Sequence, residues 1–200
     1  MQPIEILVLY YSGGGSVKSL AKFIARGINS VDGVIARVRT VPQIHAEKED
    51  IESSHPYVML SDLSECKALA LGSPVYFGGM SAHLKYFLDS TSTTWLTGKL
   101  INKPACVFTS SASMHGGQEA CLLSMMLPLM HHGMILVGIP YSEPSLISTT
   151  TGGTPYGVTH VAGDNDEKNI SIDEKNLAIN QGKRLAEITL LLNQNKGYIK

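Results

Sequence analysis

Short apolar runs alternate along this chain with segments of helical periodicity, and this alternation most limits the folds that are open to it. The runs lack the polar alternation of a half-exposed strand, so we expect both of their faces to be covered, as in a parallel sheet. Residues 34–41 do alternate, which indicates a partly solvated strand at an edge. The continuous runs are 4–10, 68–72, 105–108 and 134–139.

Helical periodicity fills the segments between these runs. From Val17 to Ile28, apolar residues recur at spacings of three and four, which is typical of an amphipathic helix. Pro128 is expected to kink or end a later helix, because proline has no N–H group to donate. The other expected helices are 82–88, 121–129 and 172–193.

An alternation of strands and helices predicts a parallel sheet covered by helices on both faces. We expect one domain over residues 1–200, an α/β flavodoxin-like three-layer sandwich whose five-stranded parallel sheet has the order 2-1-3-4-5. A ligand crevice should then lie at the carboxyl ends of strands 1 and 3. Residues 43–65 indicate a connecting helix or a long excursion. Residues 140–166 exceed the usual length of a connection, so we expect them to be functional or mobile.

Charge and cysteine content exclude several classes of protein. The net charge of -1 disfavours binding to nucleic acid or to an anionic membrane, and no apolar run is long enough to span a bilayer. The first nine residues lack a basic leader, so no signal peptide is expected. The three cysteines form no CxxC pair, which predicts buried thiols in a reducing, cytoplasmic compartment and no metal site.

The glycine-rich stretch 12–16 follows the first apolar run directly and could form three kinds of phosphate loop. A Walker A loop is excluded because Ser16, not lysine, follows Gly15, and a dinucleotide fingerprint is disfavoured because Lys18 stands at its third glycine. A loop for flavin mononucleotide (FMN) fits, since the serines supply hydroxyls and the glycines expose N–H groups at a helix N-terminus. A plain glycine turn capped by Ser16 stays open from this loop alone.

Two further loops rich in small residues follow the third and fourth strands, at 72–81 and 109–119. Parallel neighbouring strands end at one edge, so these loops should lie beside the first. A flavin ring needs apolar walls and backbone donors near its polar edge. The candidate walls are Val75, Tyr76 and Phe77, and the candidate donors surround Gly78, Gly79, Ser110, Ser111 and Ser113.

The combined motifs resemble those of the WrbA-type NAD(P)H:quinone oxidoreductases. The similarity covers most of the chain, from the first strand to the final helix. The matching stretches are Tyr10-Tyr11-Ser12, 72–89, 95–98, 116–119, 131–134 and 152–157. Many members carry Thr-Arg where this chain has Val75-Tyr76, and the stretch 111–117 is one residue longer here.

The resemblance implies a flavodoxin-like homotetramer that binds FMN and reduces quinones by two electrons, using NADH or NADPH, with hydride passing through flavin N5. It implies that Trp95 lies on the substrate side and that His131 touches the flavin pocket, both as catalytic residues. The residues implied to hold the phosphate and ribityl chain are Ser12, Gly13, Gly14, Gly15, Ser16 and Val17. Those implied around the flavin ring are Val75, Tyr76, Phe77, Gly78, Ser110, Ser111, Ala112, Ser113 and His115.

Two other functions compete with this interpretation. A flavodoxin-type electron carrier would be expected to show a strongly acidic docking surface, which a net charge of -1 disfavours. A non-enzymatic flavin-binding regulatory scaffold could use the long segment 140–166 for its partners. The acidic stretch 164–167 superficially resembles a calcium loop, but its spacing indicates a solvated turn instead.

Overall fold

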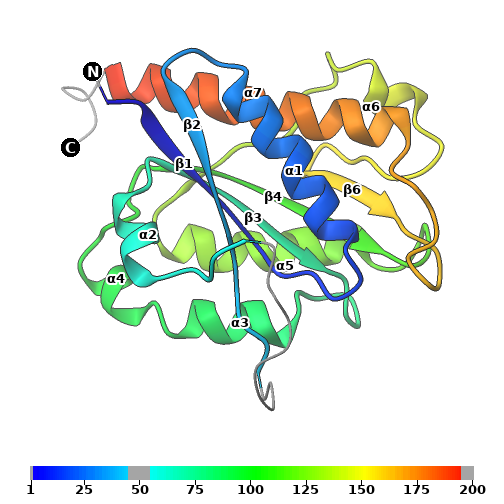
Figure 1. The fold of residues 1–200 in the computed structure, drawn as a ribbon, viewed down its shortest axis with the longest axis horizontal. Helices are drawn as coiled ribbons and strands as arrows, with labels where there is room; N and C mark the ends of the chain where they lie inside the picture. The colour runs from blue at the N-terminus through cyan, green and yellow to red at the C-terminus, as the bar shows by residue number, and fades with distance from the viewer. Residues whose placement is uncertain (1, 45–54, 195–200) are drawn as a thin grey trace.

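The computed structural model describes residues 2–44 and 55–194 (Figure 1). A parallel sheet has the strand order β2-β1-β3-β4-β5, and a sixth strand, β6, pairs with β4. The predicted order 2-1-3-4-5 is therefore confirmed. The strands are β1 (Ile4–Tyr10), β2 (Val34–Thr40), β3 (Ala68–Pro74), β4 (Pro104–Ser111), β5 (Ile135–Leu136) and β6 (Val158–Val161).

Helices cover both faces of the sheet, so the three-layer prediction is confirmed. In Figure 1, α1 and α7 lie on one face and α3, α4 and α5 on the other. Alternate residues of β1 divide between the two cores: Ile6 and Val8 pack beneath α1 and α7, while Leu7 and Leu9 face the opposite layer. The helices are α1 (Ser16–Asn29), α2 (Leu60–Glu65), α3 (Ala82–Asp89), α4 (Ser92–Leu96), α5 (Gln118–His131), α6 (Ser145–Ser148) and α7 (Ile172–Gln194).

The last strand differs from its prediction. The run 134–139 was expected to form one strand, but β5 has only two residues, which pair with the first two residues of β4. The last hydrogen bond to β4 runs from Val137 N–H to the Ala105 carbonyl at 2.7 Å, whereas Ile139 N–H donates to the Pro155 carbonyl at 2.9 Å, so the chain leaves the sheet after Val137. It returns as β6, which pairs with the far half of β4, from Phe108 to Ser111. The long segment between them is thus largely an insertion that splits the fifth strand.

The helices α1 and α7 approach each other backbone to backbone. A Cβ atom on Gly27 would overlap the carbonyl group of Ile179, and one on Gly182 would overlap the carbonyl group of Ile24. Two glycines, one on each helix, therefore set the separation of this layer. Helical periodicity could not reveal this contact, because it does not say which helices are neighbours.

Three further expectations have clear outcomes. The strand 34–41 lies at an edge as β2, whose partner strand is β1; its last residue, Thr40, also makes an isolated bridge with Tyr57. Pro128 does not end its helix: α5 continues to His131, and the N–H group of His132 still donates to the Pro128 carbonyl at 3.0 Å. Part of the segment 43–65 forms α2, while 45–54 lies outside the described residues. No helix in the described ranges is both long and apolar enough to cross a membrane.

Candidate functional site

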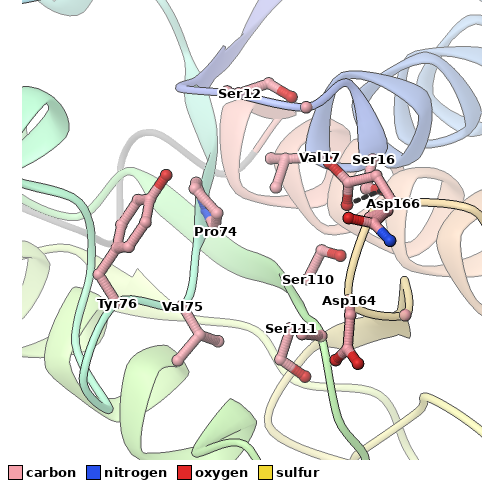
Figure 2. Close-up of a pocket in the computed structure, with 15 residues that line it drawn as sticks. Ser12, Ser16, Val17, Pro74, Val75, Tyr76, Ser110, Ser111, Asp164 and Asp166 are labelled. Atoms are coloured by element: carbon pink, nitrogen blue, oxygen red, sulfur yellow. Dashed lines mark hydrogen bonds between the residues drawn. The ribbon is translucent and has the colours of Figure 1, made fainter.

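A cavity of about 250 Å³ lies at the carboxyl ends of β1, β3 and β4, where the crevice was expected (Figure 2). The loops after these three strands meet around it, together with a fourth segment that follows β6. The strand order explains the meeting, because β1, β3 and β4 are direct neighbours that run in one direction. The lining residues are Ser12, Gly13, Gly14, Ser16, Val17, Pro74, Val75, Tyr76, Ser110, Ser111, Ala112, Gly163, Asp164, Asn165 and Asp166.

The first loop is folded by the hydroxyl of Ser12. This oxygen accepts hydrogen bonds from the N–H groups of Gly15 at 3.0 Å and Lys18 at 3.4 Å. Gly15, with φ of 106°, is the N-cap of α1, so Ser16 is the first helical residue and not the cap. The N–H groups of Ser16 and Val17 consequently have no intrahelical partner and can serve an anion in the cavity.

The second loop contains a tight turn. The N–H groups of Tyr76 and Gly79 each donate to the other residue's carbonyl at 3.0 Å, and the two residues between them, Phe77 and Gly78, have φ of 50° and 77°. Positive φ at both central positions is typical of a type I′ turn. The Tyr76 ring and Val75 line the cavity, whereas the side chain of Phe77 projects fully into solvent.

The third loop continues from β4 and is joined to the second. Val75 N–H donates to the Ser110 carbonyl at 2.8 Å. The Ser111 hydroxyl is held by Gln118, whose Nε2 donates to it at 2.8 Å. Ser113 and His115 lie farther along this loop, are exposed, and do not line the cavity.

The fourth wall, residues 163–166, was missed as part of a site by the sequence interpretation. The N–H groups of Ala162 and Gly163 donate to the carbonyls of Ser111 and Ala112 at 2.8 and 3.1 Å, which carries the chain from β6 along the third loop. Asp166 then reaches α1, where it accepts a hydrogen bond from the Ser16 hydroxyl at 2.9 Å. The acidic stretch is evident in the sequence, but its contact with Ser16 at the start of α1 is not. Within the described ranges, no group of three or more histidine, cysteine, aspartate or glutamate side chains is placed so that it could hold a metal ion.

A buried pair of side chains, His160 and Glu174, holds the base of this fourth wall in place. His160 Nδ1 lies 2.9 Å from Glu174 Oε2, and each side chain is 1% exposed. His160 Nε2 lies 3.1 Å from the carbonyl oxygen of Lys168, at the end of the acidic segment. Burial alone would raise the pKa of Glu174, but hydrogen bonds from His160 and from the N–H groups of Ser171 and Gly152 outweigh it and lower the pKa to about 2.

Comparison with known proteins gives the family. The sequence pattern of the NADPH-dependent FMN reductase family matches residues 4–142. The chain belongs to this family. A protein of Chromohalobacter salexigens named NAD(P)H dehydrogenase (quinone) is 41% identical over 94% of this chain and 98% of its own length. A protein of the same name from Solidesulfovibrio magneticus is 37% identical over 93% of this chain and 98% of its own length.

Solved structures agree on the fold of this family member. The WrbA-like flavodoxin from Agrobacterium tumefaciens has a TM-score of 0.64 at 23% identity, covering 94% of this chain and 98% of that one. Flavodoxin 1 from Bacillus cereus has a TM-score of 0.58 at 17% identity, covering 92% and 97%. The flavodoxin-like fold expected from the sequence is therefore confirmed.

The structure places Trp95 and His131 away from the cavity just described. They line a second cavity of about 390 Å³, where Trp95 Nε1 donates to the His131 carbonyl at 2.9 Å. Trp95 lies on α4, which precedes β4, and His131 ends α5, which precedes β5, so both are at the amino ends of the strands (Figure 1). The adjacent His132 also lines this second cavity but is buried, with Nε2 2.9 Å from the Thr91 hydroxyl.

Proposed function

We propose that the protein is an FMN-dependent NAD(P)H:quinone oxidoreductase. The observation that carries the proposal is the single cavity formed by the glycine-rich loop after β1 and the loops after β3 and β4. Membership of the NADPH-dependent FMN reductase family supports it, as do near-full-length relatives named NAD(P)H dehydrogenase (quinone).

The residues of the cavity fit FMN. A Cβ atom on Gly13 would stand 3.4 Å from the Tyr76 hydroxyl, so the loop backbone faces the cavity at close range. Hydroxyls and first-turn N–H groups of α1 are suitable donors for a phosphate, and no lysine or arginine is found among the described lining residues. This donor set is typical of a site that binds phosphate through backbone and helix dipole.

Each loop then has a distinct role in the proposed site. The residues 12–17 hold the phosphate and the ribityl chain, while Val75 and Tyr76 form an apolar wall for the flavin ring. Ser110, Ser111 and Ala112 offer backbone groups to its polar edge. FMN, when bound, accepts hydride from NADH or NADPH and passes two electrons to a quinone. Gly15, Phe77, Gly78, Ser113 and His115 do not line the cavity directly and are assigned to its supporting loops and rim.

We also propose a homotetramer in which a neighbouring copy brings Trp95 and His131 to the flavin. In their own chain, both residues lie at the amino ends of the strands, whereas the cavity lies at the carboxyl ends. A role at the flavin therefore needs a second copy. The surface of α3, α4 and α5 carries a group of exposed large apolar side chains, which supports an interface there. Its exposed side chains include Tyr86, Trp95, Leu96, Leu123, Leu127 and Met130.

A cytoplasmic location is proposed from the thiols. Cys66, Cys106 and Cys121 are free and buried. A protein of this kind needs no oxidising compartment for its stability.

Flavin titration followed by steady-state kinetics tests the function. We expect one FMN per chain, quenching of its fluorescence, and FMN-dependent oxidation of NADH or NADPH with benzoquinone as acceptor. FMN binding without turnover would favour the electron carrier, and absence of flavin binding would favour the regulatory scaffold. Sedimentation velocity of wild type and Leu127→Glu tests the tetramer. The variant places a charge in the apolar surface, so we expect it to dissociate the tetramer.

A further inference from the structure

Asp166 places a carboxylate on the loop that is proposed to bind the FMN phosphate. Its Oδ1 accepts the hydrogen bond from the Ser16 hydroxyl at 2.9 Å, and Figure 2 shows its side chain directed at the start of α1. The same carboxylate lies so close to the loop backbone that a Cβ atom on Gly14 would overlap Asp166 Oδ2. A phosphate oxygen that accepts hydrogen bonds from this backbone needs the same space.

The start of α1 favours a negative group, and the helix does not provide one itself. Its first turn contains no acidic residue, and the N–H groups of Ser16 and Val17 lack intrahelical partners. Asp166, distant in sequence, supplies the negative charge that a phosphate would otherwise bring. The carboxylate and the phosphate are thus alternatives at one anion-binding position.

The segment that carries Asp166 is anchored to the fold at its base, whereas its tip is a turn held by hydrogen bonds of its own, from Asn165 N–H to Glu167 Oε2 at 2.8 Å and from Asp166 N–H to the Gly163 carbonyl at 3.4 Å. The base is held by β6, by the hydrogen bond from Lys168 N–H to the Ala162 carbonyl at 2.9 Å, and by the His160 contact with Lys168. The tip is exposed, and Asp166 itself has φ of 54°, a left-handed conformation that costs an aspartate free energy. A rearrangement of this turn alone would withdraw the Asp166 carboxylate from Ser16 and leave the base in place.

We propose that Asp166 is an internal competitor of the FMN phosphate: it closes the glycine-rich loop in the flavin-free protein and must leave when FMN binds. This inference rests on the proposed function and concerns how the same site selects a phosphorylated flavin. It makes two specific demands. Loss of the Asp166 charge must raise the affinity for FMN. It must not raise the affinity for riboflavin, which has the same ring and ribityl chain but no phosphate.

Fluorescence titration of flavin-free protein with FMN and with riboflavin tests the inference. We expect Asp166→Asn and Asp166→Ala to tighten FMN binding about tenfold, the scale of one like charge removed from a few ångströms away at a solvated site. Stopped-flow mixing should show faster FMN association for both variants. Riboflavin affinity should stay as in the wild type. Circular dichroism confirms that the variants fold.

Asp164→Ala is the matched control. Asp164 lines the same cavity and carries the same charge, but Figure 2 shows its side chain pointing away from Ser16. Its removal should change FMN affinity much less than removal of Asp166. An equal effect of both variants would overturn the inference. It would mean that the acidic segment repels the FMN phosphate through its overall negative charge, and that Asp166 does not compete with the phosphate for one position.

The remaining outcomes are also decisive. Unchanged or weaker FMN binding in the Asp166 variants, or a parallel gain for riboflavin, would overturn the inference alone, since wild-type FMN binding would still support the proposed function. Binding of neither flavin by any of these proteins would overturn both.

Discussion

The imidazole of His160 and the carboxylate of Glu174 form a fully buried pair, with Nδ1 2.9 Å from Oε2, directly beneath the cavity wall that follows β6. Glu174 also accepts hydrogen bonds from the N–H groups of Gly152, Ser171 and Val161 at 2.8, 2.8 and 3.1 Å. One carboxylate therefore ties the insertion, β6 and the start of α7 together. Its ionisation should be coupled to stability.

Glu174→Gln tests this coupling. The pKa of Glu174 is about 2 in the folded protein against an ordinary value of 4.5, a difference that corresponds to roughly 3 kcal/mol. Because the folded-state pKa is the lower one, this stabilisation is complete above about pH 5 and is lost as the pH falls toward 2. We expect urea unfolding at pH 7 to show a loss of about 3 kcal/mol in the variant, shrinking as the pH is lowered.

Glu187→Gln is the control for this measurement, because Glu187 lies on the same helix but is exposed beside Lys183. Its effect should stay below about 0.5 kcal/mol at every pH. A gap between wild type and Glu174→Gln that does not change with pH would contradict the ionic explanation.

The cysteines should be unreactive in the native protein. Burial raises the pKa of the Cys106 thiol to about 12 and, although nearby lysines oppose it, that of Cys66 to about 11. Thiolate is the reactive form, so a disulfide reagent at pH 8 should modify none of the three thiols until denaturant is added. Rapid modification of one thiol in native protein would show that its element opens locally.

Gly182→Ala should separate α1 from α7. The new methyl group would overlap the Ile24 carbonyl, so we expect a net loss of about 1–3 kcal/mol in the free energy of unfolding, despite alanine's better helix propensity. Asn176→Ala, at an exposed position of the same helix, is the control and should be neutral or slightly stabilising. Urea unfolding of both variants measures this, and a stabilised Gly182→Ala would mean that the helices can move apart without cost.

Phe77 combines a strained backbone with an exposed ring beside the cavity. Its φ of 50° is unfavourable for any residue with a Cβ atom and neutral for glycine. We expect Phe77→Gly to be about 1 kcal/mol more stable than Phe77→Ala, which keeps the strain and removes the same ring. If the ring serves the flavin or quinone, both variants should lose turnover equally. Equal unfolding midpoints for the pair would argue against strain in the turn.

Much of this protein was determined by local sequence signals. Continuous apolar runs indicated buried parallel strands, and the spacing from Val17 to Ile28 indicated α1. The glycine-rich stretch 12–16 indicated a loop between β1 and α1, and this loop lines the cavity. These signals are readable because periodicity reports how each segment is buried, and because neighbouring parallel strands place their following loops at one edge.

Only the tertiary structure decided which distant segments meet. The split of the last strand, with β6 beside the far half of β4, brings Asp166 to Ser16 across 150 positions of sequence. The tertiary structure alone also decided the glycine contact between α1 and α7. It alone placed Trp95 and His131 at the amino ends of the strands, opposite the cavity. Such contacts depend on strand pairing and helix direction across the whole chain, and local periodicity carries no record of them.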